Sequence, residues 1–163
     1  PCGGAPMGRQ WFGLTFRDPG ERWRGVVQAR PALDAFLDAE LERHGLTEDN
    51  LALVGFSQGT MMALHAGLRR KTSPAAIVGY SGTLVGEEHL QAEVTARPPV
   101  LLVHGDQDEV IPVQALFHAA QALSQAEIPV EWHMSPGVGH GIDGGGLMHG
   151  LSFIARAFDV RVG

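Results

Sequence analysis

A serine flanked by two glycines carries the strongest chemical signal in the sequence. Residues 55–59 read GFSQG, the G-x-S-x-G pattern in which a serine stands on a sharp turn between a strand and a helix. An apolar run ends at Phe56 and a helical pattern begins at Gln58, so the turn would hold the Ser57 hydroxyl out beyond the strand. The backbone N–H of Gln58, at the start of the helix, would then lie where an oxyanion forms. The pattern favours a nucleophilic serine over its alternative, an ordinary strand-to-helix turn with a serine N-cap.

A serine hydroxyl is a weak nucleophile until a base removes its proton, so a histidine and an acid must lie near Ser57. His140 follows one later apolar run in the loop GVGHG, residues 137–141, and two aspartates follow another in HGDQD, residues 104–108. The order serine, acid, histidine matches that of α/β hydrolases. Asp106 directly follows a glycine, which is typical of a turn residue, and this favours Asp108 as the acid without excluding Asp106.

Strands and helices alternate along the chain in a way that can position these side chains. Four short apolar runs, at residues 51–56, 75–80, 100–104 and 130–134, predict strands, and helical patterns cover 21–44, 58 to about 70, 113–126 and 145–158. The first three runs are continuously apolar, as in parallel strands covered on both faces, and the fourth alternates, as in an edge strand. We therefore expect an α/β fold whose mostly parallel, doubly wound sheet is flanked by helices.

The predicted strands bring the candidate residues to one edge of the sheet. Ser57, Asp108 and His140 each follow the carboxyl end of a strand, which is where open α/β sheets place their sites. The helix that precedes the first strand should end at Gly45, and Pro31 either kinks it or marks a restart.

Composition limits the class of protein. The chain has 163 residues, 44% of them hydrophobic and 18% charged, which fits a single α/β domain with one core over residues 1–163. Lys and Arg number 12 against 18 Asp and Glu, and the net charge of −6 argues against a nucleic-acid partner. A single cysteine excludes an internal disulfide, and no apolar run approaches the length of about 20 residues that an integral membrane segment needs.

Metal and cofactor sites are not expected either. The histidines lack the spacing of paired metal ligands, and the glycine-rich stretch 137–146 lacks the ending of a phosphate loop. His104, at the end of a predicted buried strand, is expected to be a hydrogen-bonded structural residue.

Three motifs together resemble the carboxylesterase/phospholipase and acyl-protein thioesterase family of α/β hydrolases. They are GFSQG at 55–59, HGDQD at 104–108 with Val110 and Pro112 nearby, and GVGH at 137–140, and Trp11-Phe12 also resembles a family segment. The resemblance implies that Ser57 is the nucleophile, Asp108 the orienting acid and His140 the general base, with Gln58 supplying a backbone oxyanion donor.

The same resemblance implies cofactor-free hydrolysis of short- to medium-chain carboxyl esters, through an acyl-enzyme on Ser57. The small-molecule substrate would be an ester or a thioester. The alternatives are an acyl-protein or acyl-coenzyme A thioesterase, a lysophospholipase, or a non-catalytic fragment that lacks the oxyanion loop.

Residues 1–20 depart from the family pattern. Nothing in them resembles the family's N-terminal strands or its His-Gly loop, which supplies a second oxyanion donor, so we expect the sequence to be the C-terminal portion of a longer hydrolase. Unpaired apolar sheet edges would favour association, such as a homodimer. The single cysteine and the lack of a signal pattern fit a cytoplasmic location.

Overall fold

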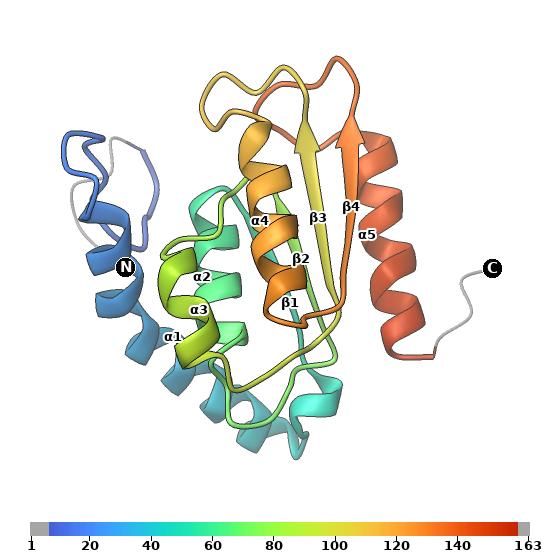
Figure 1. Cartoon of the computed structure of the whole chain (residues 1–163). Helices are drawn as coiled ribbons and strands as arrows, with labels where there is room; N and C mark the ends of the chain where they lie inside the picture. The colour runs from blue at the N-terminus through green and yellow to red at the C-terminus, as the bar shows by residue number, and fades with distance from the viewer. Residues whose placement is uncertain (1–6, 160–163) are drawn as a thin grey trace.

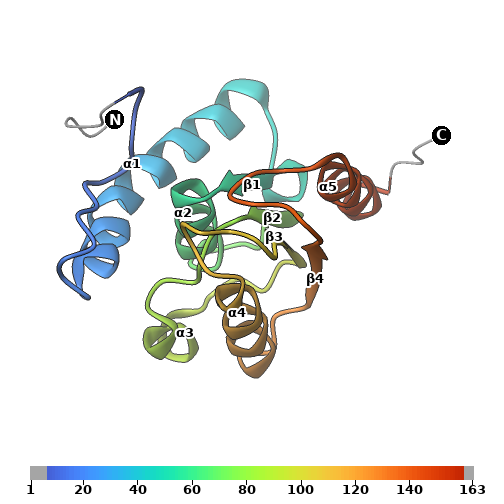
Figure 2. The same ribbon diagram turned by 90° about the horizontal axis from the view of Figure 1, so that it is seen from above.

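The computed structural model describes residues 7–159, which form a four-stranded parallel sheet between helices (Figures 1 and 2). The strands lie side by side in chain order: β1 (Ala52–Phe56), β2 (Ala76–Tyr80), β3 (Val100–Gly105) and β4 (Val130–Ser135). All three strand pairs are parallel. The expected α/β sheet is confirmed.

Helices cover both faces of the sheet, as a doubly wound fold requires. They are α1 (Glu21–His44), α2 (Gln58–Gly67), α3 (Glu87–Glu93), α4 (Gln114–Gln125) and α5 (Gly144–Ala157), with a short 3-10 helix η1 (Glu48–Asn50) before β1. Helices α2 and α4 lie on one face and α5 on the other, while α1 packs against α2 and α3 against α4 (Figure 2).

Alternate side chains of the strands therefore enter two separate cores. Ile77 and Leu102 point into the larger core, where α1, α2 and α4 add Val26, Leu64 and Leu123. The smaller core lies under α5 and consists of Ala76, Val78, Tyr80, Leu101, Val103 and Phe153. Burial on both faces explains why β2 and β3 are apolar at nearly every position.

Strand β1 differs from the sequence expectation, because only one of its faces is covered. It lies at the edge of the sheet in the described residues, and the side chains of Val54 and Phe56 are 58% and 42% exposed. Both point to the face on which α5 lies, but α5 packs mainly on β2, β3 and β4. The prediction that the first strand is buried on both faces is therefore wrong here, whereas β4 is the edge strand that its alternation predicts.

Helix α1 ends where the sequence predicts. Gly45 adopts the left-handed conformation, with φ 63°, and the N–H of Leu46 bonds to the Leu41 carbonyl at 2.9 Å, which closes the last turn. The helix continues through Pro31, so of the two alternatives for this residue, a kink or a restart, the restart does not occur. Helix α2 is shorter than expected, because it ends at Gly67 rather than near Arg70.

The carboxyl ends of the strands lie level with one another and continue as hydrogen-bonded loops. Ser57 donates its backbone N–H to the Tyr80 carbonyl at 2.8 Å, and Ser81 donates to the Val103 carbonyl at 2.9 Å. The N–H of Asp106 likewise bonds to Ser135 at 3.2 Å. The loops after β1, β3 and β4 therefore start from one rigid edge.

Candidate active site

The turn that carries Ser57 has a backbone conformation that few residues adopt. Ser57 has φ 53° and ψ −115°, a positive φ that costs a residue with a side chain about 1–3 kcal/mol. The first turn of α2 offsets this cost, because the N–H groups of Thr60 and Met61 both bond to the Ser57 carbonyl. The serine is thus held on a sharp corner between β1 and α2, as the G-x-S-x-G pattern predicts.

The tightness of the corner explains one glycine of the motif and not the other. A Cβ on Gly55 would lie 2.4 Å from the backbone of Gly59, so any side chain at position 55 would push α2 away from β1. A Cβ on Gly59 would meet nothing within 4 Å in the described residues. Gly82, from the loop after β2, is also required, because its Cβ would lie 2.9 Å from the Ser57 carbonyl oxygen.

His140 lies in the loop between β4 and α5 and bridges the two other candidate residues. Its Nε2 lies 3.0 Å from the Ser57 hydroxyl oxygen, and its Nδ1 lies 2.8 Å from a carboxylate oxygen of Asp108. A carboxylate only accepts, so Nδ1 carries the proton and Nε2 is free to accept the serine hydroxyl proton. The Phe56 ring packs beside the imidazole, with a centroid separation of 5.0 Å.

The Asp108 carboxylate is fully buried and well satisfied with hydrogen bonds. One oxygen accepts the N–H groups of Val110 and Ile111 at 2.9 and 2.8 Å, and the other accepts His140. Burial alone would raise the pKa of Asp108, but the hydrogen bonds from His140, Ile111 and Val110 outweigh it and lower the pKa below the ordinary value. The carboxylate therefore stays ionised beside the imidazole.

Asp106 occupies a different place, although it is only two residues away. Its carboxylate accepts the N–H of Gly137 at 2.7 Å, and the neighbouring Gln107 N–H bonds to the Val138 carbonyl at 2.9 Å. Asp106 thus ties the loop after β3 to the loop that carries His140. The sequence left open which of the two aspartates lies beside the histidine. In the structure Asp108 contacts His140, whereas Asp106 contacts Gly137.

Two further residues support this arrangement. His104 is buried, as expected of a structural residue, and its Nε2 donates to the Ile111 carbonyl at 2.8 Å while lying 3.3 Å from Asp108. Ser81, which the sequence analysis missed, has φ 49° and donates its hydroxyl to the carbonyl of Gly141 at 3.1 Å. A positive φ cannot be read from a lone serine, so no sequence signal points to it.

The remaining candidate, Gln58, is the first residue of α2, directly after Ser57. The first N–H groups of a helix have no acceptor within the helix, so its backbone N–H is available to an oxyanion. Over residues 7–159 no group of three or more His, Cys, Asp or Glu side chains is placed to hold a metal ion. Within the same range, none of the helices combines the length and apolar character needed to cross a bilayer.

The chain is similar to known proteins of one family. The family model described as Phospholipase/Carboxylesterase matches residues 3–157. Acyl-protein thioesterase 1 of Gibberella zeae is 30% identical over 125 residues, which cover 74% of this chain and 53% of that protein. Esterase YpfH of Escherichia coli is 25% identical over 151 residues, covering 93% of this chain and 64% of that protein.

The solved structures show the same fold. The crystal structure of esterase PE8 superposes with a TM-score of 0.91 at 42% identity, covering 96% of this chain and 74% of that one. SOBER1 of Arabidopsis thaliana superposes at 0.76 with 23% identity, over 91% of this chain and 74% of that one. The chain spans between half and two thirds of the length of the two curated relatives.

Proposed function

The chain belongs to the phospholipase/carboxylesterase family, and from this premise we propose that it is a serine hydrolase that cleaves carboxyl esters through an acyl-enzyme on Ser57. The observation that carries the proposal is the chain of hydrogen bonds from Ser57 through His140 to Asp108, at 3.0 and 2.8 Å. Three side chains from loops far apart in sequence converge on this order of nucleophile, base and acid.

Acylation begins when His140 removes the serine proton. As Nε2 takes that proton, the Ser57 oxygen attacks the ester carbonyl carbon, and the carbonyl oxygen becomes an oxyanion. The backbone N–H of Gln58 donates to this oxyanion, which forms beside the start of α2. The tetrahedral intermediate then expels the alcohol, which receives the proton from His140, and Ser57 is left acylated.

Deacylation repeats these steps with water. His140 takes a proton from a water molecule, whose oxygen attacks the acyl carbonyl, and the proton then returns to Ser57 as the acid departs. Asp108 holds the imidazole with its proton on Nδ1 and stabilises the imidazolium formed in both halves of the reaction. Short- to medium-chain esters are the proposed substrates.

A thioester substrate is the second candidate. It is favoured by one observation, that a relative 30% identical over most of this chain is an acyl-protein thioesterase. The same serine chemistry serves either bond, so turnover of an ester and a thioester with the same acyl group would separate the two candidates.

The proposal predicts that Ser57→Ala abolishes turnover of p-nitrophenyl butyrate. Loss of the nucleophile should lower kcat by at least about 10³-fold, because only binding and the oxyanion donor remain. A fluorophosphonate probe should label the parent protein and leave the variant unlabelled. Ser124→Ala, on the exposed surface of α4, is the matched control and should keep the parent rate. Equal rates in Ser57→Ala and the parent would refute the assignment.

A further inference from the structure

The side chain of Gln58 forms two hydrogen bonds that the proposed reaction does not use. Its Oε1 accepts the backbone N–H of Trp11 at 2.7 Å, and its Nε2 donates to the backbone carbonyl of Phe12 at 2.9 Å. Both partners lie more than 40 residues earlier in the chain. The residue after the proposed nucleophile thus binds the segment that leads into α1.

This pairing requires an amide. The backbone N–H of Trp11 is a donor and the backbone carbonyl of Phe12 is an acceptor. A glutamine side chain carries the matching acceptor, Oε1, and donor, Nε2, on one planar amide. A carboxylate at position 58 could accept from Trp11 but not donate to Phe12, and an apolar side chain could do neither. The two bonds therefore act as a small clamp between residues 11–12 and the start of α2.

Other contacts hold the same segment to α1. The buried Phe12 ring packs so closely on Gly25 that a Cβ there would lie 2.3 Å from it. Further along, the N–H groups of Thr15 and Phe16 donate to the Glu21 carboxylate. The Gln58 amide connects this segment to the helix that begins at the reacting serine.

The segment that the clamp holds carries an exposed aromatic residue. The Phe12 side chain is buried, whereas the neighbouring Trp11 is 40% exposed, and its backbone is bonded to the residue that follows Ser57. An indole offers a large, rigid apolar surface with few rotatable bonds, which suits contact with an alkyl chain.

We propose that Gln58 is a positioning residue whose side-chain amide fixes Trp11 beside Ser57, where the indole binds the acyl chain of the substrate. The substrate-contact part rests on the proposed function, whereas the clamp itself does not. The chemical class of the ligand is a straight alkyl chain on the acyl side of an ester or thioester.

The clamp is tested without any activity measurement, by trypsin cleavage after Arg9. Arg9 is exposed and lies two residues before the clamp, and a protease needs several residues around the cleaved bond to detach. Gln58→Met keeps the side-chain length but removes both hydrogen bonds, and cleavage between Arg9 and Gln10 should accelerate about tenfold. Gln121→Met, the same change on the exposed face of α4, should leave the rate unchanged. Equal cleavage in the two variants would disprove the clamp.

The substrate contact is tested by chain-length selectivity. Trp11→Ala, at an exposed position, should lower kcat/KM for p-nitrophenyl octanoate about tenfold and leave the acetate within about twofold. Gln58→Met should lower the same octanoate-to-acetate ratio. The double variant should fall no further than Trp11→Ala alone, because both changes act through one indole.

The outcomes separate the two proposals. An unchanged octanoate-to-acetate ratio in Trp11→Ala would overturn the acyl contact while hydrolysis continues. If the parent protein neither hydrolyses any ester or thioester nor reacts with the fluorophosphonate, the proposed function fails. The cleavage rates after Arg9 still decide whether the clamp exists in that case.

Discussion

At the scale of single residues, position within a loop decides what an aspartate does. Asp108 is enclosed by two backbone N–H groups and an imidazole, so each of its two carboxylate oxygens accepts from at least one specific donor. Asp106 meets one backbone N–H of the next loop and remains at the surface of the site. The two residues share one side-chain chemistry and differ in their neighbours.

Because their neighbours differ, we expect an Asp-to-Asn substitution to lower kcat strongly at one of these positions and hardly at the other. In Asp108→Asn, the two backbone N–H groups continue to bond to the amide oxygen, so the amide NH₂ group faces His140. Because an NH₂ group only donates, the imidazole proton must move from Nδ1 to Nε2. A protonated Nε2 can no longer accept the hydroxyl proton of Ser57. The kcat for p-nitrophenyl butyrate should fall by about 10⁴-fold. Asp106→Asn keeps an oxygen for Gly137 and should stay within about threefold of the parent. Comparable losses in the two variants would contradict the different roles assigned to these carboxyl groups.

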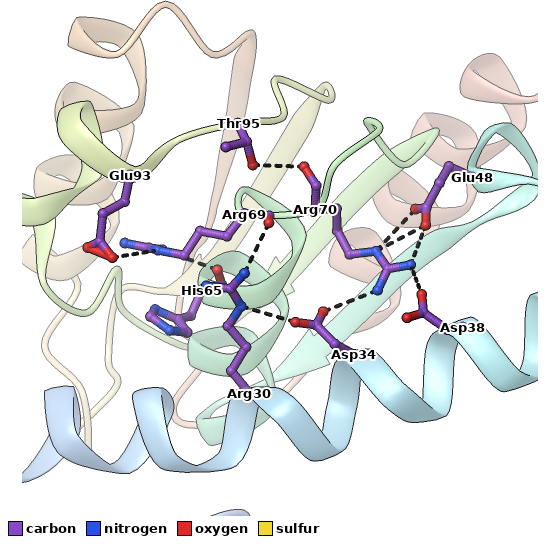
Figure 3. Close-up of polar contacts among 9 residues, drawn as sticks. All are labelled: Arg30, Asp34, Asp38, Glu48, His65, Arg69, Arg70, Glu93 and Thr95. Atoms are coloured by element: carbon purple, nitrogen blue, oxygen red, sulfur yellow. Dashed lines mark hydrogen bonds and ion pairs between the residues drawn. The ribbon is translucent and has the colours of Figure 1, made fainter.

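At the scale of elements, one guanidinium connects three pieces of secondary structure. Arg70, just after α2, is buried and pairs with Asp34 and Asp38 of α1 and with Glu48 of η1 (Figure 3). Burial would lower the pKa of Arg70, but the hydrogen bonds to Glu48, Asp38 and Asp34 outweigh it and raise the pKa. The network fixes α1 against the end of the helix that begins at Ser57.

Removing this guanidinium should therefore weaken the whole assembly of α1, η1 and α2. Arg70→Met leaves three carboxylates facing one another, and we expect the free energy of unfolding in urea to fall by about 2 kcal/mol. The matched control is Arg43→Met, an exposed arginine that pairs with Glu40, and its effect should stay below about 0.5 kcal/mol. Equal shifts of the urea midpoint would mean that the network contributes no more than a surface ion pair.

The long elements could be predicted from sequence, because each carries a periodic pattern or a marked end. The glycine after His44 and the apolar runs of β2 and β3 are such signals. Helix α3 was not predicted, since its seven residues bury only Leu90 and therefore show no apolar stripe. The exposure of Val54 could not be predicted either, because an apolar strand does not reveal what packs against it.

The candidate site likewise has parts that could be predicted from the sequence and parts that could not. The glycines and the order of motifs pointed to Ser57 and His140, and the family resemblance favoured Asp108. The contact between Gln58 and residues 11–12 could not be foreseen, because it joins a side chain to backbone groups across 46 residues and leaves no sequence pattern.

At the scale of the whole molecule, a buried histidine makes stability depend on pH. His65 of α2 lies in the interior, with its ring edge-on to Trp23 at 5.5 Å, and its Nδ1 has no hydrogen-bond partner within the described residues. Burial, together with the nearby charges of Arg69 and Arg30, lowers the pKa of His65 to about 3. Figure 3 shows His65 of α2 together with Arg30 of α1 and Arg69, which follows α2. The histidine is therefore neutral in the folded protein.

The unfolded chain takes up this proton near pH 6.5, well before the folded protein does. Because the unfolded state binds more protons between pH 6.5 and about 3, the free energy of unfolding should decrease as the pH falls through this window. From pH 7.5 to 5, His65 should contribute a loss of about 2 kcal/mol. His65→Phe should remove that part of the decrease, measured by urea unfolding at both pH values. If the parent and the variant lose the same stability, the histidine is not the source.

The order of the strands has a consequence for how the site comes together during synthesis. Among the described strands, β2, β3 and β4 each pair with the strand before them in the chain, so this part of the sheet can be extended in chain order as the ribosome releases it. The turn of Ser57 and the loop of Asp108 depend on the first three strands, whereas His140 follows β4 and is steadied by α5 behind it. The proposed base is thus the last of the three residues to emerge, and a nascent chain would carry a serine that stays unreactive until β4 has paired and His140 has reached it.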